Sequence, residues 1–420
     1  MKIRHMLFLS LAAATCYGLL VKPCSGSANT GRQATRGTAQ ADRLVLLDGT
    51  ALDDTVAAID PGGAVRTKGS GAPIELDGLR RIERPGPAAP AQAAPCEVYL
   101  AGGGVLRAQD AAFDGRQFSV TWAYGGPTAL PLAAVRALLL GRAPAGEAGA
   151  LAPEFAAALA RDELPRDELF AAADQALQVV RGALQKVSPQ EVRFIWNDAE
   201  RQVQRARVYG VVLARRGAPP DRAGQCLIRL ADGSSLWATV AGMKGRRLSV
   251  GIPGGADLVL PWDAVRRIEV RSTRMVFLSD LDPVEVRQEP LVTYAGPWRR
   301  DRNVLGGPLV LAETAYEKGL GVHSRTCLVY QVGGRYDVFA ATIGIDASAA
   351  GRGDCVFSVA ADDKELFRKR VRGTDPPVPV RLPVRGAGRL ALAVDWGEDL
   401  DLADLADWCD ARLLKESGGP

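Results

Sequence analysis

The sequence predicts a mostly β protein in which repeated small SH3-like or Sm-like β-units precede a C-terminal antiparallel β-sandwich of the jelly-roll type. Two observations lead to this fold class. Short apolar runs separated by Gly-containing turns recur along residues 41–272. After Arg274 the runs become longer and alternate in polarity, as in Tyr336–Ile343, and no convincing helix interrupts them.

The N-terminus has the layout of a secretory signal peptide. A charged start precedes the apolar run Met6–Ala14, which is shorter than the roughly 20 residues needed to cross a bilayer. Small residues follow, so we expect cleavage near Ala28, with residues 1–28 as signal peptide and 29–40 as a disordered leader. The mature protein is then secreted or extracytoplasmic, in the periplasm or at the cell surface, with no transmembrane segment.

Lipidation is a competing interpretation of the same region. Cys16 and Cys24 both lie close to the expected cleavage point, but Lys22 and Pro23 precede Cys24 where small apolar residues are wanted. The formal net charge of +4 falls to +1 once the signal peptide is removed with its three cations, Lys2, Arg4 and Lys22. This balance gives no electrostatic case for nucleic acid or an anionic membrane as partner.

The seven cysteines are widely spaced and form no CxxC pair, which argues against a zinc site and against a disulfide framework. A single bridge between Cys327 and Cys355 stays open. The alternative is that the cysteines are small buried hydrophobes within strands.

Four β-units are expected before the sandwich, at 41–84, 96–142, 167–215 and 225–272, the third of them diverged. Units of roughly 45 residues built from several short strands suggest small bent barrels. A β-propeller blade is the competing interpretation, although no Trp-Asp signature recurs. Residues 143–166 are expected to form a helical linker, and Leu169–Leu184 also has helical spacing.

The C-terminal third resembles the NPCBM family of carbohydrate-binding modules. Six blocks carry the resemblance, in the expected order: Phe277–Pro283, Tyr316–Ser324, Gly333–Phe339, Ile343–Asp346, Phe357–Val359 with Lys364–Phe367, and Ala406–Leu413. The resemblance covers 274–415. It implies a galactose-binding-like jelly roll, a carbohydrate ligand, and a structural calcium ion in some relatives.

Sugar binding needs a flat aromatic face and a few fixed polar groups. The aromatic candidates are Trp298, Tyr316 and Trp396, while Trp408 is expected in the core. The polar candidates are Glu317, Arg325, Asp395 and Asp407. His323 is the one histidine left after leader removal, and it is expected to hydrogen-bond backbone or a sugar hydroxyl.

Hard oxygen ligands for calcium gather in one acidic loop, at Glu398, Asp399, Asp401 and Asp404. The alternative is a solvated loop that holds no ion. No other cofactor is indicated.

No sequence typical of a catalytic site is visible: there is no G-x-S-x-G, P-loop or HExxH motif. The repeats also leave no stretch for a (β/α)-barrel of roughly 250 residues. We therefore expect an exported, non-catalytic protein that binds a glycan or polysaccharide through the sandwich, while the repeats present it or contact other surface proteins. The alternatives are a cell-surface scaffold without sugar binding and, less favoured, an accessory part of a glycoside hydrolase.

Overall fold

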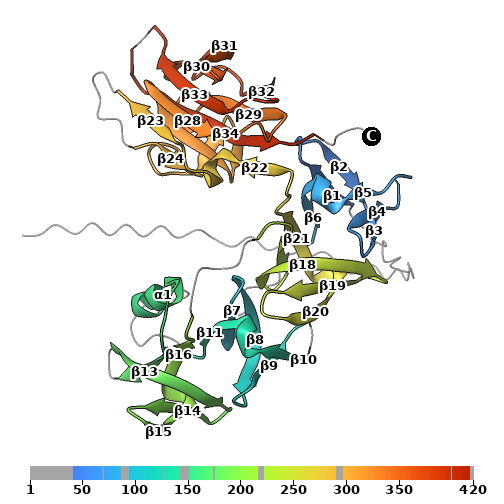
Figure 1. Ribbon diagram of the computed structural model, residues 1–420, viewed down its shortest axis with the longest axis vertical. Helices are drawn as coiled ribbons and strands as arrows, with labels where there is room; N and C mark the ends of the chain where they lie inside the picture. The colour runs from blue at the N-terminus through green and yellow to red at the C-terminus, as the bar shows by residue number, and fades with distance from the viewer. Residues whose placement is uncertain are drawn as a thin grey trace, which may run out of the picture. The chain divides into compact units, whose positions relative to one another are not determined.

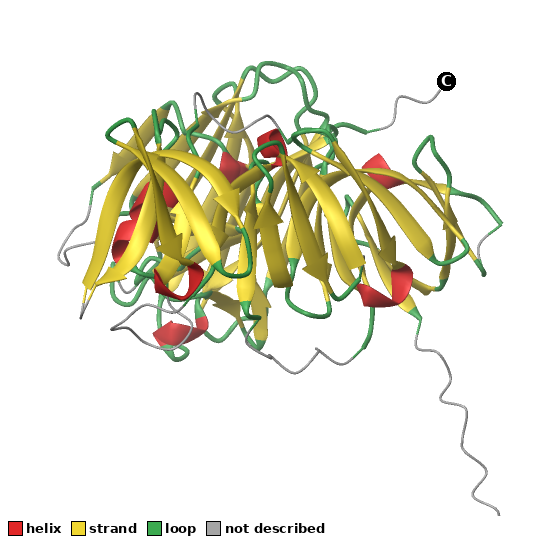
Figure 2. Cartoon of the chain, turned by 90° about the horizontal axis from the view of Figure 1, so that it is seen from below, coloured by secondary structure: helices red, strands yellow, loops and turns green. Residues whose placement is uncertain are grey.

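Strands dominate the protein, as the sequence predicts (Figure 2). The computed structural model describes residues 41–69, 71–86, 94–124, 126–141, 151–173, 176–215, 222–289, 297–398 and 400–416. Within these ranges one α-helix occurs, α1 (Pro153–Ala160), and no helix is long and apolar enough to span a membrane. The expected signal peptide and leader lie outside the described residues.

Four successive groups of strands, which we call the β-units, precede the sandwich (Figure 1). The first contains β1 (Asp42–Leu46), β2 (Ala51–Asp54), β3 (Val56–Ile59), β4 (Ala64–Thr67), β5 (Ile74–Glu75) and β6 (Leu79–Glu83). The second contains β7 (Cys96–Leu100), β8 (Gly104–Phe113), β9 (Gln117–Trp122), β10 (Gly126–Pro131) and β11 (Val135–Leu139). The third contains β12 (Asp167–Ala173), β13 (Ala176–Val187), β14 (Glu191–Trp196), β15 (Ala199–Gln204) and β16 (Val208–Val212). The fourth contains β17 (Cys226–Leu230), β18 (Ser235–Lys244), β19 (Arg247–Ile252), β20 (Ala256–Pro261) and β21 (Val265–Val270).

Each β-unit closes on itself. A 3-10 turn leads into the last strand, and that strand pairs antiparallel with the first: β6 with β1, β11 with β7, β16 with β12 and β21 with β17. In the second, third and fourth units, the second strand is long and carries a register shift. This strand therefore bends and pairs with strands on both sides of its unit. First-to-last pairing suits a small barrel, whereas the first and last strands of a propeller blade lie at opposite edges.

The segment with helical spacing, Leu169–Leu184, forms strands β12 and β13 and not a helix. Its apolar residues also satisfy the two-residue period of a strand, and β12 finds a partner in β16. Pairing within the sheet therefore decides between the two periods. The helical part of the 143–166 linker is α1, whose Phe155 packs into a small cluster with Phe170 and Tyr209.

The β-units share edges and a core. β11 pairs with β16, and β6 pairs with β21, so neighbouring units hide their strand edges against one another. One hydrophobic cluster runs through all four units, with Trp262, Phe118 and Phe194 among its largest buried members.

The C-terminal sandwich follows directly. Its strands are β22 (Met275–Phe277), β23 (Glu285–Gln288), β24 (Arg299–Arg300), β25 (Leu309–Leu311), β26 (Thr314–Tyr316), β27 (Gly319–His323), β28 (Thr326–Gln331), β29 (Val338–Ile345), β30 (Asp354–Ala361), β31 (Lys364–Arg372), β32 (Val378–Pro383), β33 (Arg389–Trp396) and β34 (Leu405–Leu414). One sheet has the order β24-β27-β34-β29-β32, with β22 also on β34, and the other has β23-β28-β33-β30-β31. Trp408, Phe357 and Phe339 fill the space between them, so Trp408 is in the core, as expected.

Among the described residues the cysteines form no disulfide, and this holds for Cys327 and Cys355. The bridge considered between these two is absent because β33 lies between their strands, β28 and β30. Two strand spacings, roughly 9 to 10 Å, exceed the Cα separation that a disulfide tolerates.

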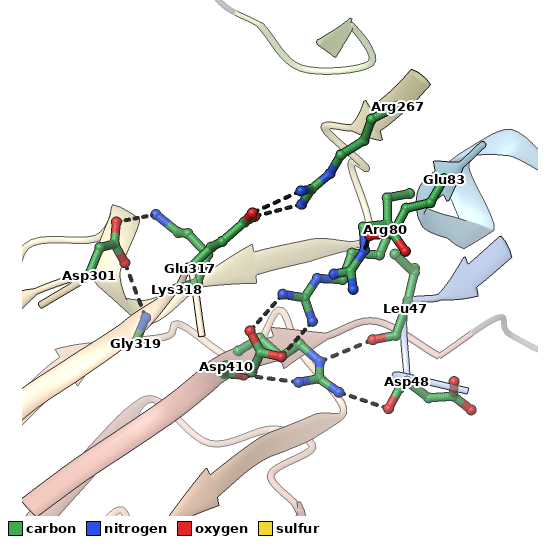
Figure 3. Close-up of polar contacts among 12 residues, drawn as sticks. Leu47, Asp48, Arg80, Glu83, Arg267, Asp301, Glu317, Lys318, Gly319 and Asp410 are labelled. Atoms are coloured by element: carbon green, nitrogen blue, oxygen red, sulfur yellow. Dashed lines mark hydrogen bonds and ion pairs between the residues drawn. The ribbon is translucent and has the colours of Figure 1, made fainter. Parts of the chain in front are cut away.

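The sandwich contacts the first β-unit through arginines (Figure 3). Arg80 donates to both carboxylate oxygens of Asp410, at 2.7 and 2.6 Å. Arg412 is buried and donates to the main-chain oxygens of Leu47, at 3.0 Å, and Asp48, at 2.7 Å. Leu47 itself packs among buried apolar residues of the sandwich. We call this set of contacts the seam.

Candidate functional site

Several predicted site residues meet at one end of the sandwich. β27 ends at His323, which pairs with Leu405 at the start of β34. In the other sheet Thr326 at the start of β28 pairs with Val394, near the end of β33 at Trp396. The turn at 324–325 and the loop at 397–404 therefore lie at the same end, which we call the His323 end.

Arg325 and Trp396 form the centre of this end. Arg325 occupies the β27–β28 turn with a φ of +59°, a left-handed conformation that directs its side chain across to β33. Its guanidinium carbon lies 4.8 Å from the centroid of the Trp396 ring, a cation–π contact. Its Nη2 donates to Glu289 Oε2 at 2.9 Å. The indole is half-buried, so an aromatic surface and a charged hydrogen-bonding group are held side by side at the surface.

His323 and Ser324 line the same turn from beneath and are both buried. Ser324 Oγ lies 3.4 Å from His323 Nδ1. The partner is a side-chain hydroxyl, whereas the sequence led us to expect backbone or a sugar hydroxyl.

The acidic loop is fixed by charge pairs that the sequence did not reveal. Arg370 of β31 donates to both carboxylate oxygens of Asp354 and forms an ion pair with Glu398 at 2.7 Å. The Asp354 carboxyl also accepts from the Glu398 main chain, and the Asp354 main chain donates to Asp404. Hydrogen bonding from Arg370 holds the pKa of Asp354 and of Glu398 below their ordinary values.

The expected calcium ligands are therefore engaged with protein groups where the structure describes them. Glu398 is held by Arg370, while Asp401 and Asp404 are buried, and Asp399 lies outside the described residues. Across the described ranges no three His, Cys, Asp or Glu side chains are grouped so that they could hold a metal ion.

Tyr316 and Glu317 lie away from the His323 end. They precede β27, whose first residue pairs with Cys409 in the middle of β34, four residues from the pair that His323 forms with Leu405. Glu317 accepts two hydrogen bonds from Arg267 of β21, at 2.8 and 2.5 Å, and so belongs to the contacts with the β-units (Figure 3). The structure does not bring these two residues together with His323 and Trp396.

Trp298 and Asp395 are two further predicted site residues. Trp298 directly precedes β24, whose Arg299 pairs with Gly321, so it lies on the His323 side of that strand pair. Asp395 precedes Trp396 on β33 and accepts from the Trp396 main chain at 3.0 Å. Both are half-buried at the His323 end.

Asp407 is the third residue of β34, paired in register with Gly321 and Gly344, and is buried. Burial, followed by the nearby Asp346, raises its pKa well above the ordinary value. No described donor reaches either of its carboxyl oxygens. Asp407 therefore lies inside the sandwich, close to the His323 end, and does not line the surface there.

Sequence reasoning missed Glu289, Asp354 and Arg370. Each lies at a strand end whose neighbour is distant in the chain, so no local motif indicated them. The alternation of β31 identifies Arg370 as outward-facing but gives no partner.

The NPCBM/NEW2 domain model matches residues 274–414. A curated protein of Renibacterium salmoninarum, named "Putative endo-alpha-N-acetylgalactosaminidase", is 34% identical over 110 residues, which are 26% of this chain and only 7% of that protein. Solved structures similar to this chain include CBM51 from Clostridium perfringens GH95 in complex with methyl-galactose, at 27% identity and a TM-score of 0.31, covering 33% of this chain and 99% of that one. Another is CBM51-2 with GlcNAc and INT domains from Clostridium perfringens ZmpB, at 27% identity and a TM-score of 0.32, covering 40% of this chain and 36% of that one. Residues 274–414, which hold the sandwich and its His323 end, are an NPCBM/NEW2 domain.

Proposed function

We propose that the protein is an exported, non-catalytic carbohydrate-binding protein that holds a glycan at the His323 end of the sandwich. The observation that carries this proposal is the Arg325–Trp396 pair within the matched domain. An indole offers the apolar surface on which the C–H face of a sugar ring packs, and a guanidinium offers several donors to its hydroxyls. Glu289 and Asp395 add acceptors beside them.

The arrangement is ready before the ligand arrives. Arg325 is already placed by the indole and by Glu289, so little side-chain entropy is lost when a hydroxyl joins the same group. We expect the sugar to lie over the exposed part of the indole, with Trp298 as a second aromatic contact from β24.

The carboxylates near this end do not suit glycoside hydrolysis, which needs a carboxylic acid that is protonated near neutral pH. Asp354 and Glu398 have lowered pKa values because Arg370 stabilises their charged forms. Asp407 has a raised pKa but is buried within β34. These properties support a binding role over a hydrolytic one.

The test is a glycan-array experiment with the full chain, followed by titration of the selected glycan. We expect selective binding to galactose-type or related glycans. Trp396→Ala should weaken it by at least roughly tenfold, because an aromatic contact of this kind contributes on the order of 1.4 kcal/mol or more. Trp196→Ala is the matched control, since Trp196 of β14 is also exposed but lies in the third β-unit.

Either of two results would contradict the proposal. One is the lack of glycan binding by a folded sample, which would favour the scaffold interpretation. The other is turnover of a polysaccharide that a single carboxylate substitution abolishes, which would favour a hydrolase.

A further inference from the structure

A groove with a volume of about 630 Å³ lies on the β-units, away from the His323 end. Three of the four units line it. The first contributes the end of β6 and the residues up to Gly86, the second contributes Arg107 of β8, and the fourth contributes Arg229, Arg266 and the β17–β18 turn. A volume of this size is typical of sites that hold small molecules or short oligomers.

The groove is strongly basic. Five arginines line it, against the two carboxylates of Glu83 and Asp232. Both carboxylates are already engaged: Glu83 accepts from Arg81 at 2.6 Å, and Asp232 accepts from the Ser234 main chain and hydroxyl. The negative charge in the groove is therefore occupied by neighbouring groups and does not neutralise the arginines across it.

Two of the five arginines have structural tasks. Arg84 donates to Asp42 at 2.8 Å and stacks over the Trp262 ring at 4.9 Å. Arg267 is committed to Glu317 of the sandwich (Figure 3). The other three, Arg107, Arg229 and Arg266, give the groove its binding character.

Arg107 is the most poorly paired of these three. Its Nε is buried and reaches no hydrogen-bond acceptor among the described residues, and its Nη1 lies 3.5 Å from the Asp232 main-chain oxygen. Glu97 is 3.9 Å away and already accepts from the Tyr99 hydroxyl at 2.7 Å. The Arg107 side chain is 33% exposed and its pair with Glu97 is long, so an anion in the groove can reach the guanidinium and complete its hydrogen bonds.

The β17–β18 turn holds Arg107 in this position. Gly233 has a φ of +86°, and a Cβ there would lie 3.2 Å from the Arg107 guanidinium, so the side chain packs directly on the turn. The Ser234 hydroxyl accepts from the Arg107 main chain at 2.9 Å. Arg107 is thus fixed at the groove wall by groups that do not satisfy its charge.

Arg229 and Arg266 extend the basic surface. Arg229 is half-exposed and meets one carboxylate, Glu269, at 3.2 Å. Arg266 donates to the main-chain oxygen of Asp263 at 2.7 Å. Arg107, Arg229 and Arg266 come from three separate strands, β8, β17 and β21, so the groove suits an anion that carries several charged groups.

We propose that this groove binds an anionic polysaccharide, one that carries uronate carboxylates or sulfate esters. Guanidinium groups recognise both anions with paired hydrogen bonds. Nucleic acid is a poorer match because single strands need successive aromatic platforms, and none of the described residues that line the groove is aromatic. This site is separate from the glycan site of the sandwich and does not depend on it.

The experiment uses the full chain and measures binding of a heparin-derived oligosaccharide and of an oligogalacturonate. A neutral galactan oligomer and a single-stranded oligonucleotide serve as comparison ligands. We expect micromolar-range or tighter binding of at least one acidic oligosaccharide, weakened by added salt because exposed charges are screened. The double variant Arg107→Gln/Arg229→Gln should bind it at least roughly tenfold more weakly.

The controls separate this site from other cations and from the sandwich. Arg287→Gln/Arg385→Gln removes two exposed arginines of the sandwich and should leave affinity within roughly twofold. Trp396→Ala should leave acidic binding unchanged even if it abolishes binding of neutral glycans. Arg229→Gln alone changes a half-exposed side chain, so it tests the groove even if the double variant folds poorly.

Three results would overturn the proposal. The first is no binding of either acidic oligosaccharide by the folded full chain. The second is equal binding by the groove variants and the sandwich control. The third is binding of the oligonucleotide as tight as that of the acidic oligosaccharides, which would show a general response to negative charge.

Discussion

The two ends of the sandwich use the same pair of side-chain types in different ways. At the seam Arg80 and Asp410 form a two-bond pair with side chains that are 11% and 18% exposed. At the His323 end Arg325 and Glu289 form one contact, with side chains that are 37% and 68% exposed. A buried charge must keep its partner, whereas a half-exposed charge can exchange its partner for a ligand at small cost. The exposed fraction of the side chain, and not the residue type, therefore distinguishes Arg80, which fixes the sandwich to the first β-unit, from Arg325, which is placed to bind a ligand.

The largest effect that follows from this comparison concerns Arg412. Its side chain is buried and donates to three main-chain oxygens, of Leu47, Asp48 and Asp410. Arg412→Ala would leave these acceptors without a donor and create a cavity, so we expect the free energy of unfolding to fall by roughly 3 kcal/mol. Chemical denaturation of the full chain measures this change.

Arg381→Ala is the control for Arg412. Arg381 of β32 also carries a guanidinium, but its side chain is half-exposed and pairs with Glu416. Its removal should cost less than about 1 kcal/mol. Equal losses in the two variants would show that burial at the seam does not determine the strength of these contacts.

The second prediction measures the Arg80–Asp410 pair directly. A double-mutant cycle with Arg80→Ala and Asp410→Ala should give a coupling free energy of roughly 1.5 to 2 kcal/mol, because the pair is mostly buried and joined by two hydrogen bonds. The measurement is urea denaturation of the four proteins. A coupling near zero would mean that the seam depends on Arg412 and Leu47 alone.

The third prediction concerns the pH dependence of stability, which the buried Asp407 should influence. Its folded-state pKa is raised above the unfolded value of about 4, mainly by burial. Its contribution to stability is therefore complete below pH 4 and is lost as the pH rises toward the folded pKa. Asp407→Asn cannot ionise, so we expect it to stabilise the protein at pH 7 and to flatten the decline of stability with pH.

Unfolding free energies from pH 4 to pH 8 test this directly. Asp346 acts in the opposite sense: burial raises its pKa, but hydrogen bonds donated by Asp407 and Ser348 outweigh burial and lower it, so its contribution is lost as the pH falls. Asp346→Asn should therefore destabilise the protein at pH 7. If both variants shifted stability in the same direction, the two acids would not form the unequal pair that the structure indicates.

The sequence was sufficient for the fold class and for the matched domain. Strand periodicity and turn residues are local, so the strands of the β-units and the sandwich blocks could be predicted from the chain alone. The segment at Leu169–Leu184 was ambiguous because its apolar residues suit both periods, and only pairing of β12 with β16 resolved it.

Residues of the candidate site could be predicted from the sequence, but their contacts with one another could not. Arg325 and Trp396 were both predicted, but their contact joins residues 71 positions apart in the chain. Glu317 lies inside the family block Tyr316–Ser324 and Arg325 directly follows it, yet one faces Arg267 and the other faces the indole. Burial and partners from distant strands distinguish the two, and a single sequence does not contain that information.

The smallest expected effect concerns the carboxylate that faces each arginine, Glu289 at the His323 end and Asp410 at the seam. Glu289→Gln removes the charge that faces Arg325, and Asp410→Asn does the same to Arg80. We expect Glu289→Gln to change the free energy of unfolding by less than about 0.5 kcal/mol, because its pair is exposed to solvent. It should nevertheless alter glycan affinity a few-fold, since Arg325 then meets the sugar without its carboxylate partner.

Asp410→Asn should show the reverse, with a clear loss of stability and unchanged glycan affinity. Measured by denaturation and glycan titration on the same proteins, this crossed result would separate a charge that fixes the sandwich from one that contacts its ligand. A stability loss in both variants, with glycan affinity unchanged in both, would mean that Arg325 has the same structural task as Arg80.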